Sequence, residues 1–440
     1  MAAPEVQEST EDYSKSDVYR SAVPTYDYAL GKASSPRRHP RTEVEVTLSI
    51  IDGPTTDEDE KQLLEEKRAP ERDPSGKVKL KFLNGLRGLA CLLIVHIHAG
   101  YLLEITIAPS SVDVFFVLSA FLLTMINESK IRKLITNKAS GREWAAVLLD
   151  YFIKRIMRVY PLFALVAFVL TAMPEATRTH YYNLAHYNIK SWSLWDILTF
   201  KRRYYLFWTM PIEITYYFLI PVLLVGFCFL NNVVKVKRAV IGLLYTWVYY
   251  EGWHTARTGH GEFRPHLSTF LAGSLAAVVY LELSRWVKKH KFEPSKWHLV
   301  AARAVEFTML SVMLSDVTRG LLVGWLGGSV FPSEQAVVPC VSLPISAVIV
   351  IEALAPSAIS RFFEWNVLCF TGKISFSMYL LHPFVNFLPW LVKMPRVDQF
   401  IVRLVLVYLL STASYFLVEH NSQQLGVVLG RKLSKRLESS

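Results

Sequence analysis

Two basic side chains, Arg87 and His98, interrupt the first long apolar stretch of the chain. An ionisable group inside a membrane-spanning helix costs at least about 2.5–3.5 kcal/mol, so such groups normally face a protein interior or an aqueous cavity. Their spacing of eleven residues is about three helical turns, which places both on one face, about 16 Å apart along the axis. Such a pair could hold a long anionic cofactor at one end and transfer protons at the other. The simpler interpretations are that Arg87 reaches the membrane surface and that His98 forms a hydrogen bond between helices.

A second histidine in this stretch, His96, is expected to have a structural role. It lies two positions before His98 and points about 160° away from it on a helix. We therefore expect His96 to form a structural hydrogen bond away from any reacting group.

A carboxylate lies in another apolar and aromatic run, at Glu213, two residues after Pro211. A buried carboxylate needs a partner, and a protonated His98 or an arginine is the obvious kind. The alternative is a neutral, protonated Glu213 in a structural hydrogen bond. Arg155 and Arg158 precede a further apolar segment, where they could bind phosphate groups or simply anchor the helix at the membrane surface.

The composition of the chain indicates a membrane protein. Of the 440 residues, 52% are hydrophobic and 19% are charged, against about 25% charged in an average soluble domain. Residues 1–76 hold 10 Lys and Arg against 17 Asp and Glu, so the formal net charge of +11 divides into −7 for this segment and +18 for the rest. We interpret residues 1–76 as a disordered acidic tail. In the basic remainder, Lys and Arg residues separate long apolar runs. This pattern is typical of a membrane protein and not of a protein that binds nucleic acid.

The elements that must position the candidate residues are predicted transmembrane helices. The expected fold is an all-α polytopic bundle of about ten spans. We place them at 83–103, 112–127, 156–173, 205–230, 239–253, 267–284, 299–315, 337–355, 367–391 and 401–419. The glycine-rich stretch Gly320–Phe331 is short for a span and is expected to be re-entrant or interfacial. The four cysteines have no Cys-x-x-Cys spacing, so neither a zinc site nor a disulfide framework is indicated.

Lysine and arginine counts predict the orientation of these spans. The connecting segments on the side of the N-terminal tail are rich in Lys and Arg, above all residues 128–158 and 285–296. The connecting segments on the opposite side have fewer Lys and Arg residues. The positive-inside rule therefore predicts that both termini, including a basic C-terminal tail at 421–440, are cytoplasmic.

Residues 80–420 resemble the acyltransferase type 3 family, integral-membrane acyltransferases typified by bacterial O-antigen and peptidoglycan O-acetylases. The Arg-x10-His signature of that family falls on Arg87 and His98. Further family elements follow in order, and they are Val112–Phe121, Arg155-Ile156-Met157-Arg158-Val159-Tyr160-Pro161, Trp208–Glu213 with Tyr217 and Pro221, Phe270–Gly273, Ile374–Pro383 and Glu419. Two departures are Ala120 in place of a usual glycine and Pro211 in place of a small polar residue.

The resemblance implies transfer of an acyl group, most often acetyl, from a cytoplasmic acyl-CoA to a hydroxyl of a carbohydrate, lipid or small-molecule acceptor. Histidine is suited to deprotonating that hydroxyl near neutral pH, so we expect His98 to be a general base or a transient acyl carrier, with Glu213 orienting it or neutralising its imidazolium. Arg87, Arg155 and Arg158 would hold the CoA phosphates. No metal and no particular protein partner is indicated. A solute transporter and a non-catalytic membrane scaffold are the competing interpretations.

Overall fold

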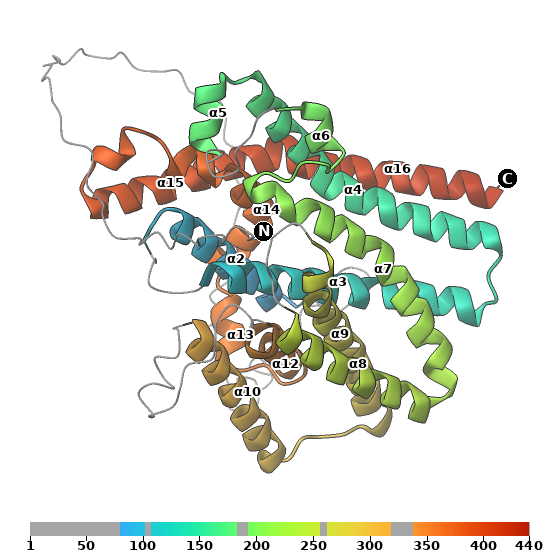
Figure 1. The fold of residues 1–440 in the computed structure, drawn as a ribbon. Helices are drawn as coiled ribbons and strands as arrows, with labels where there is room; N and C mark the ends of the chain where they lie inside the picture. The colour runs from blue at the N-terminus through green and yellow to red at the C-terminus, as the bar shows by residue number, and fades with distance from the viewer. Residues whose placement is uncertain (1–79, 102–106, 183–191, 256–261, 318–337, 440) are drawn as a thin grey trace, which may run out of the picture. The chain divides into compact units, whose positions relative to one another are not determined.

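The computed structural model describes residues 80–101, 107–182, 192–255, 262–317 and 338–439. All of them belong to one unit of the chain, Pro70–Ser440. The predicted tail at 1–76 and the stretch Gly320–Phe331 lie outside the described residues. Within the described ranges the regular structure is entirely helical (Figure 1).

The helices follow one another along the chain with short connections. They are α2 (Phe82–His98), α3 (Ile107–Thr136), α4 (Gly141–Ala172), α5 (Glu175–Tyr181), α6 (Leu194–Leu198), η2 (Tyr205–Trp208), α7 (Thr209–Phe229), η3 (Leu230–Asn232), α8 (Val234–His254), α9 (Arg264–His290), α10 (Lys296–Val317), η4 (Val338–Ser342), α12 (Leu343–Leu354), α13 (Ala358–Phe363), α14 (Asn366–Asn386), η5 (Leu391–Lys393), α15 (Arg396–Ser414), η6 (Tyr415–Glu419) and α16 (His420–Ser439).

Each of the ten predicted segments overlaps a helix, and among the described residues six helical segments are long and apolar enough to cross a membrane. Those six are Ser110–Thr136, Gly141–Ala172, Tyr205–Asn232, Arg264–His290, Lys296–Ser315 and Arg396–Leu437. Phe82–His98 and Cys340–Leu354 are shorter apolar helices. The protein is therefore a multi-pass integral membrane protein, and the number of ten crossings stays a prediction.

Several predicted helix boundaries were wrong for local reasons. The first helix ends at His98 and not at 103, because Gly100 adopts a φ of 80°, the left-handed conformation that commonly ends a helix. Helix α4 begins at Gly141 and not near 156, because Ser140 and Glu143 form a capping box there. Pro211 lies in the first turn of α7, where no intrahelical hydrogen bond is lost.

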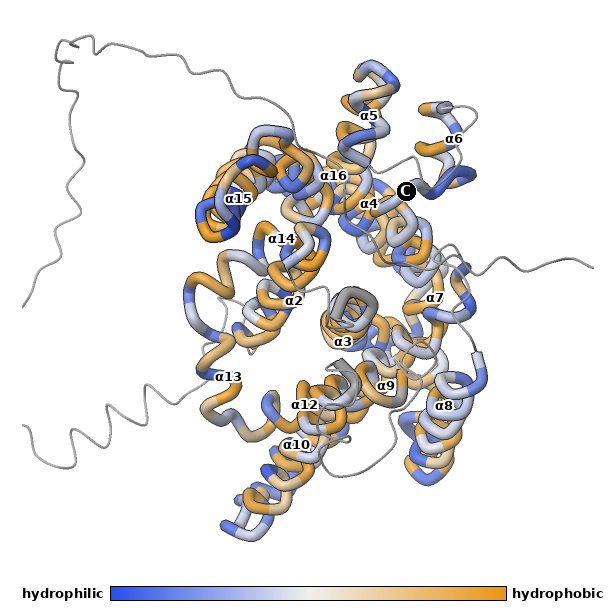
Figure 2. Tube along the Cα trace, turned by 60° about the vertical axis from the view of Figure 1, so that its left-hand side comes forward, coloured by the Kyte–Doolittle hydropathy of each residue, from blue (hydrophilic) through white to orange (hydrophobic). Residues whose placement is uncertain are grey.

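Helix α3 lies at the centre of the bundle. It packs against α2, α7, α9 and α12, and Figure 2 shows it surrounded by these helices. Its contact with α9 is close because of Gly273, where a methyl group would lie 2.3 Å from the Val117 carbonyl oxygen. The Ala120 side chain, one methyl larger than the glycine usual in the family, packs against this same glycine.

Glycines also allow α2 and α14 to approach each other closely. A methyl group on Gly372 would lie 1.8 Å from the Asn84 carbonyl oxygen, and one on Gly88 would lie 2.2 Å from that of Leu368. Backbone meets backbone at these positions, so only glycine fits. The close contact fixes which side chains of α2 face α14.

The helix ends that the positive-inside rule assigns to one side of the membrane lie close together in the structure. Lys237 at the start of α8 lies 2.6 Å from Glu282 near the end of α9. Arg285 of α9 pairs with Glu128 of α3, and Lys130 of α3 lies 3.3 Å from Asp150 of α4. These basic segments therefore share one end of the bundle.

Residues 421–439 of the predicted basic tail are helical in α16, which packs along α4. Ser434 donates a hydrogen bond to the Ala146 carbonyl oxygen at 2.9 Å. Gly426 and Gly430, one turn apart, face Met157 and Asp150. This spacing of small residues lets two helices pack closely.

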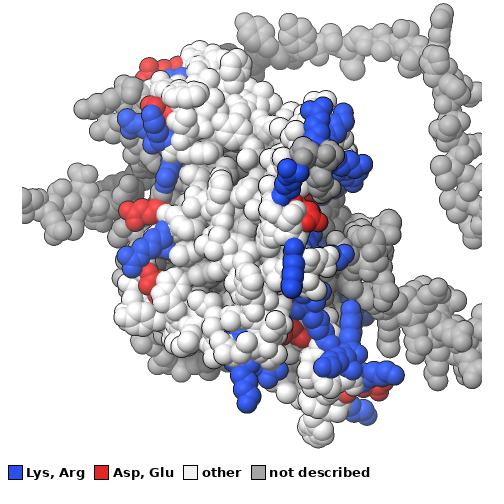
Figure 3. Space-filling model, turned by 90° about the vertical axis from the view of Figure 1, so that its right-hand side faces the viewer, with Lys and Arg blue, Asp and Glu red and all other residues white. Residues whose placement is uncertain are grey.

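The surface has the pattern expected of a protein in a bilayer. Figure 3 shows a face on which Lys and Arg gather along two edges, with a broad uncharged strip between them. Large apolar side chains in the middle of helices are exposed, among them Phe168 of α4 and Phe307 of α10, at 61% and 74%. In a bilayer such side chains contact lipid, and basic residues lie at the borders.

Candidate active site

A pocket lies between α2, α3, α4, α7 and α14, at the positions where the sequence predicts chemistry. It contains about 600 Å³ of space, which includes space open to solvent. Its walls are Arg87, Ile94, Val112, Phe115, Phe116, Ser119, Arg158, Val159, Thr209, Met210, Glu213, Ser375, Phe376 and Tyr379. The structure thus brings Arg87, Arg158 and Glu213 together from helices α2, α4 and α7.

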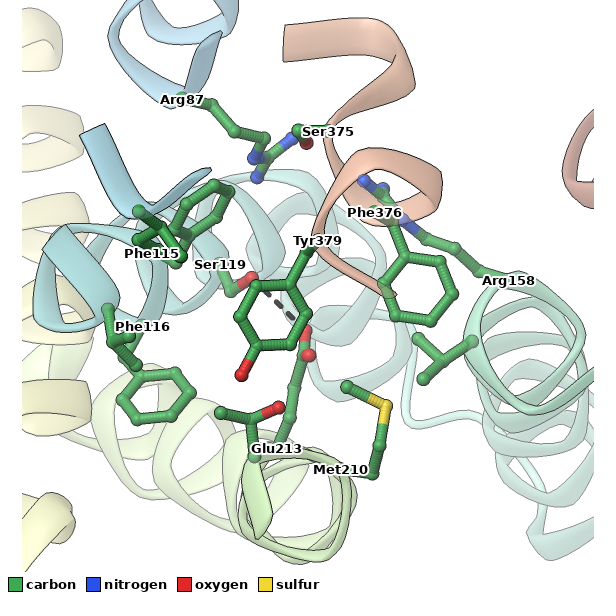
Figure 4. Close-up of a pocket in the computed structure, with 14 residues that line it drawn as sticks. Arg87, Phe115, Phe116, Ser119, Arg158, Met210, Glu213, Ser375, Phe376 and Tyr379 are labelled. Carbon is green, nitrogen blue, oxygen red and sulfur yellow. Dashed lines mark hydrogen bonds between the residues drawn. The ribbon is translucent and has the colours of Figure 1, made fainter. Parts of the chain in front are cut away.

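Three arginines gather on one side of this pocket. Figure 4 shows the guanidinium groups of Arg87 and Arg158 extending toward the space between α2, α4 and α14. Arg155, one turn before Arg158, is within electrostatic range of Arg158 and Glu213. Among the described residues, none of the three guanidinium groups has a hydrogen-bond or ion-pair partner. One buried arginine, Arg87, and two half-buried ones without such partners are a site for an anion, since a phosphate can accept their hydrogen bonds in pairs.

Glu213 accepts two hydrogen bonds from neighbouring hydroxyl groups. Ser119 of α3 donates to its Oε1 at 3.2 Å (Figure 4). Tyr217, one turn along α7, donates to the same atom at 2.7 Å. Arg87 and Arg155 are within electrostatic range of this carboxylate. The structure does not bring Glu213 and His98 into hydrogen-bond contact, since hydroxyl groups are the partners of Glu213 and another residue is the partner of His98. A role of Glu213 in orienting or neutralising His98 stays a prediction.

The partner of His98 is His382 of α14. His98 Nδ1 lies 3.0 Å from His382 Nε2, and the two rings are nearly parallel, with 5° between their planes. His382 is fully buried, and its Nδ1 lies 3.3 Å from the Met378 carbonyl oxygen. Asn386, one turn further along α14, donates to the Val95 carbonyl oxygen of α2 at 3.0 Å and holds the same two helices together.

The hydrogen bonds of this pair assign the protons on both rings. A carbonyl oxygen can only accept, so His382 Nδ1 carries the hydrogen and its Nε2 has the free lone pair. His98 Nδ1 must then donate to that lone pair. In the neutral pair, His98 Nε2 is left unprotonated and able to accept a proton.

The histidine pair lies one helical turn beyond the pocket. Ile94 and Tyr379 line the pocket, and His98 and His382 follow them by four and three residues on the same two helices. Arg87 and His98 both face α14, so the predicted common face of α2 is confirmed. His96 points elsewhere: its Nδ1 bonds to the Leu92 carbonyl oxygen at 2.5 Å, and its ring packs on Phe400, as expected for a structural role.

Ser119, Tyr217 and His382 are site residues that sequence reasoning did not select. His382 stands 284 residues from His98, and no spacing links the two. The only signal was a polar residue inside an apolar run, which Ser119 and His382 share. Among the described residues, no group of three or more His, Cys, Asp or Glu side chains could hold a metal ion.

Comparison with known proteins gives one match. The model of the acyltransferase type 3 family, described as an acyltransferase domain, matches residues 80–420. This range begins just before α2 and ends just after η6, so it includes every residue of the pocket and of the histidine pair. No curated protein and no solved structure gives a significant match.

Proposed function

Because the chain belongs to the acyltransferase type 3 family, we propose that it is an O-acyltransferase that uses a cytoplasmic acyl-CoA, most simply acetyl-CoA. The acceptor is a hydroxyl group of a carbohydrate, a lipid or a small molecule. Both chain termini lie in the cytoplasm in this proposal, as the distribution of Lys and Arg predicts. The observation that carries the proposal is that Arg87, which lines the pocket with Arg158 of α4, lies on the same face of α2 as His98, a histidine with a free Nε2.

The arginine side of the pocket suits the phosphate groups of the donor. Arg87, Arg155 and Arg158 provide three positive charges, and Glu213 alone among the pocket-lining side chains is acidic. The excess positive charge favours a polyanion, and the planar guanidinium groups can bind phosphate oxygens in pairs. Glu213 and its two hydroxyl donors keep the cluster from being more strongly positive when the donor is absent.

The distance between the two ends matches an extended cofactor. Arg87 and His98 are about 16 Å apart along α2, so a donor with its phosphates at Arg87 extends its thioester toward His98. The apolar and aromatic walls between them, including Ile94, Phe115 and Phe116, exclude water from the thioester. Holding the thioester and the acceptor close together between these walls would raise the rate of acyl transfer through proximity.

His98 acts as the general base in this proposal. Its Nε2 takes the proton of the acceptor hydroxyl while the hydroxyl oxygen attacks the thioester carbonyl carbon. The carbon–sulfur bond then breaks, and the imidazolium returns the proton to the CoA thiolate. His382 is a positioning residue, since it accepts the hydrogen of His98 Nδ1 and keeps Nε2 free.

A reconstitution experiment tests the proposal. The full chain is purified into lipid nanodiscs and incubated with radiolabelled acetyl-CoA and an extract of glycans and lipids from its native membrane. We expect CoA release that depends on the extract, with label transferred to an acceptor.

Two other outcomes would contradict the proposal. Exchange of solute across proteoliposomes without CoA release would indicate a transporter. Absence of solute exchange, of CoA release and of CoA binding would indicate that the protein is a non-catalytic membrane scaffold.

A further inference from the structure

A second cavity lies on the other side of α2, between α2, α3, α10, α12 and α13. It contains about 870 Å³ of space, which includes space open to solvent. Its lining is formed almost wholly by aliphatic and aromatic side chains, and the exceptions in the described lining are Ser110, Ser111 and Glu352. None of its lining residues belongs to the arginine pocket. We propose that this cavity holds a hydrocarbon chain of a membrane lipid.

The acidic residue of the lining is not available to a ligand. One oxygen of Glu352 lies 2.5 Å from Arg303 Nη1, and the other accepts from the backbone N–H groups of Ser357 and Ser360 at 3.0 and 2.9 Å. Glu352 is 1% exposed. The Glu352 carboxylate binds α10 and the start of α13 and has no oxygen left for a ligand. A ligand at this end of the cavity therefore meets only apolar groups.

The apolar lining excludes water and favours hydrocarbon. A water molecule in a cavity needs two to four polar partners, and apolar cavities of protein interiors stay dry. An empty cavity leaves the dispersion contacts of its walls unmade. In a bilayer the abundant apolar molecule is the lipid chain, which satisfies these contacts.

The depth of the cavity matches one chain. Its lining on α2 runs from Phe82 to Leu93, eleven residues, or about 16 Å. A bilayer has a hydrocarbon core about 30 Å thick, so the chains of one leaflet extend about half of that distance. The cavity therefore has the length of one lipid chain lying parallel to α2.

The cavity lies beside a helix that faces the bilayer. Only 6% of the apolar stretch of α10 is buried, whereas Ile345 and Ile349 of α12, on the other wall, are 2% and 0% exposed. Figure 2 shows α10 at the edge of the bundle, with α12 between it and α3. A chain that enters beside α10 leaves the lipid phase without crossing a polar layer.

Photo-crosslinking tests the proposal without relying on acyl transfer. The full chain is placed in nanodiscs of phosphatidylcholine, a small fraction of which carries a diazirine on its acyl chain. After irradiation, the labelled peptides are identified by mass spectrometry. We expect label on the cavity side of α2 and α12, at Leu89, Leu93 and Ile345, in addition to label on the exposed Phe307 of α10.

Cavity-filling variants provide the decisive comparison. Ala90→Trp fills the space from α2 and Val348→Phe fills it from α12, and either should lower labelling of the opposite wall at least fivefold while labelling of Phe307 stays constant. Val305→Trp, on the exposed side of α10, is the matched control and should change nothing.

Three results would overturn the proposal. They are label confined to exposed positions, cavity labelling unchanged in both folded filling variants, or loss of cavity label on adding palmitoyl-CoA. The last result would assign the cavity to the donor's chain.

Discussion

The two faces of α2 border cavities of similar size and opposite chemistry. On one face Arg87 and His98 point toward α14, and Arg87 lines a pocket that also contains Arg158 and the Glu213 carboxylate. On the other, Leu86, Leu89 and Leu93 line a cavity that is apolar almost throughout. The backbone is the same helix in both cases, so the side chains alone decide which cavity can bind an anion and which can bind hydrocarbon. Variants on either face of α2 test this division.

Loss of the proposed base should have the largest effect. We expect His98→Ala to lower kcat for acyl transfer by about 10²–10⁴-fold, the usual contribution of general base catalysis. The matched control is His96→Ala, two residues away, whose side chain bonds to its own helix; it should stay within about threefold of wild type. The measurement is transfer from labelled acetyl-CoA at equal expression, and wild-type turnover by His98→Ala would remove the assignment.

Loss of the arginines should act on binding of the donor. Arg87→Ala and Arg158→Ala should each weaken CoA affinity about tenfold to a hundredfold, because a hydrogen bond to a charged group is worth about 1.5–3 kcal/mol. Titration calorimetry in nanodiscs measures this. Arg132→Ala is the control, since Arg132 pairs with Glu128 at the bundle end, 3.7 Å away. Unchanged affinity in the double variant would rule out the phosphate role.

A change at His382 should lower turnover without changing donor binding. His382→Phe keeps a ring at this buried position but removes the acceptor for His98 Nδ1, so His98 Nε2 is no longer held free. We expect kcat to fall about tenfold with an unchanged KM for acetyl-CoA. His382→Gln, which restores an acceptor, should recover part of the loss. Equal loss in both variants would indicate a purely structural role.

The smallest effect on donor binding should come from the apolar face. Leu93→Ala should leave CoA affinity within about twofold of wild type, since Leu93 lines the other cavity. It should lower stability by about 1–2 kcal/mol, less than the 2–5 kcal/mol typical of a fully buried leucine, because Leu93 is only half-buried. Thermal unfolding in detergent and CoA titration measure the two quantities. A tenfold loss of affinity would contradict the division of α2 into two faces.

The sequence predicted helices well because a long apolar run in a membrane protein has few other solutions. It also predicted the common face of Arg87 and His98, since spacing along one helix determines direction. The sequence could not predict which side chains from distant helices would become partners. The pairing of His98 with His382 depends on the glycine contact between α2 and α14. Glu213 accepts hydrogen bonds from Ser119 and Tyr217, whereas a histidine or an arginine was expected as its partner.

Helices α15, η6 and α16 form one continuous helical segment, Arg396–Leu437, of 42 residues. At about 1.5 Å per residue this is about 63 Å, twice the thickness of a bilayer core. Its last turns pack on the first half of α4, which carries Arg155 and Arg158 further along. A protein shortened at residue 420, where the family match ends, would expose the Ala146 and Asp150 face of α4 to water. Expression trials and fusion tags should therefore keep the chain through residue 439 and attach any reporter beyond it.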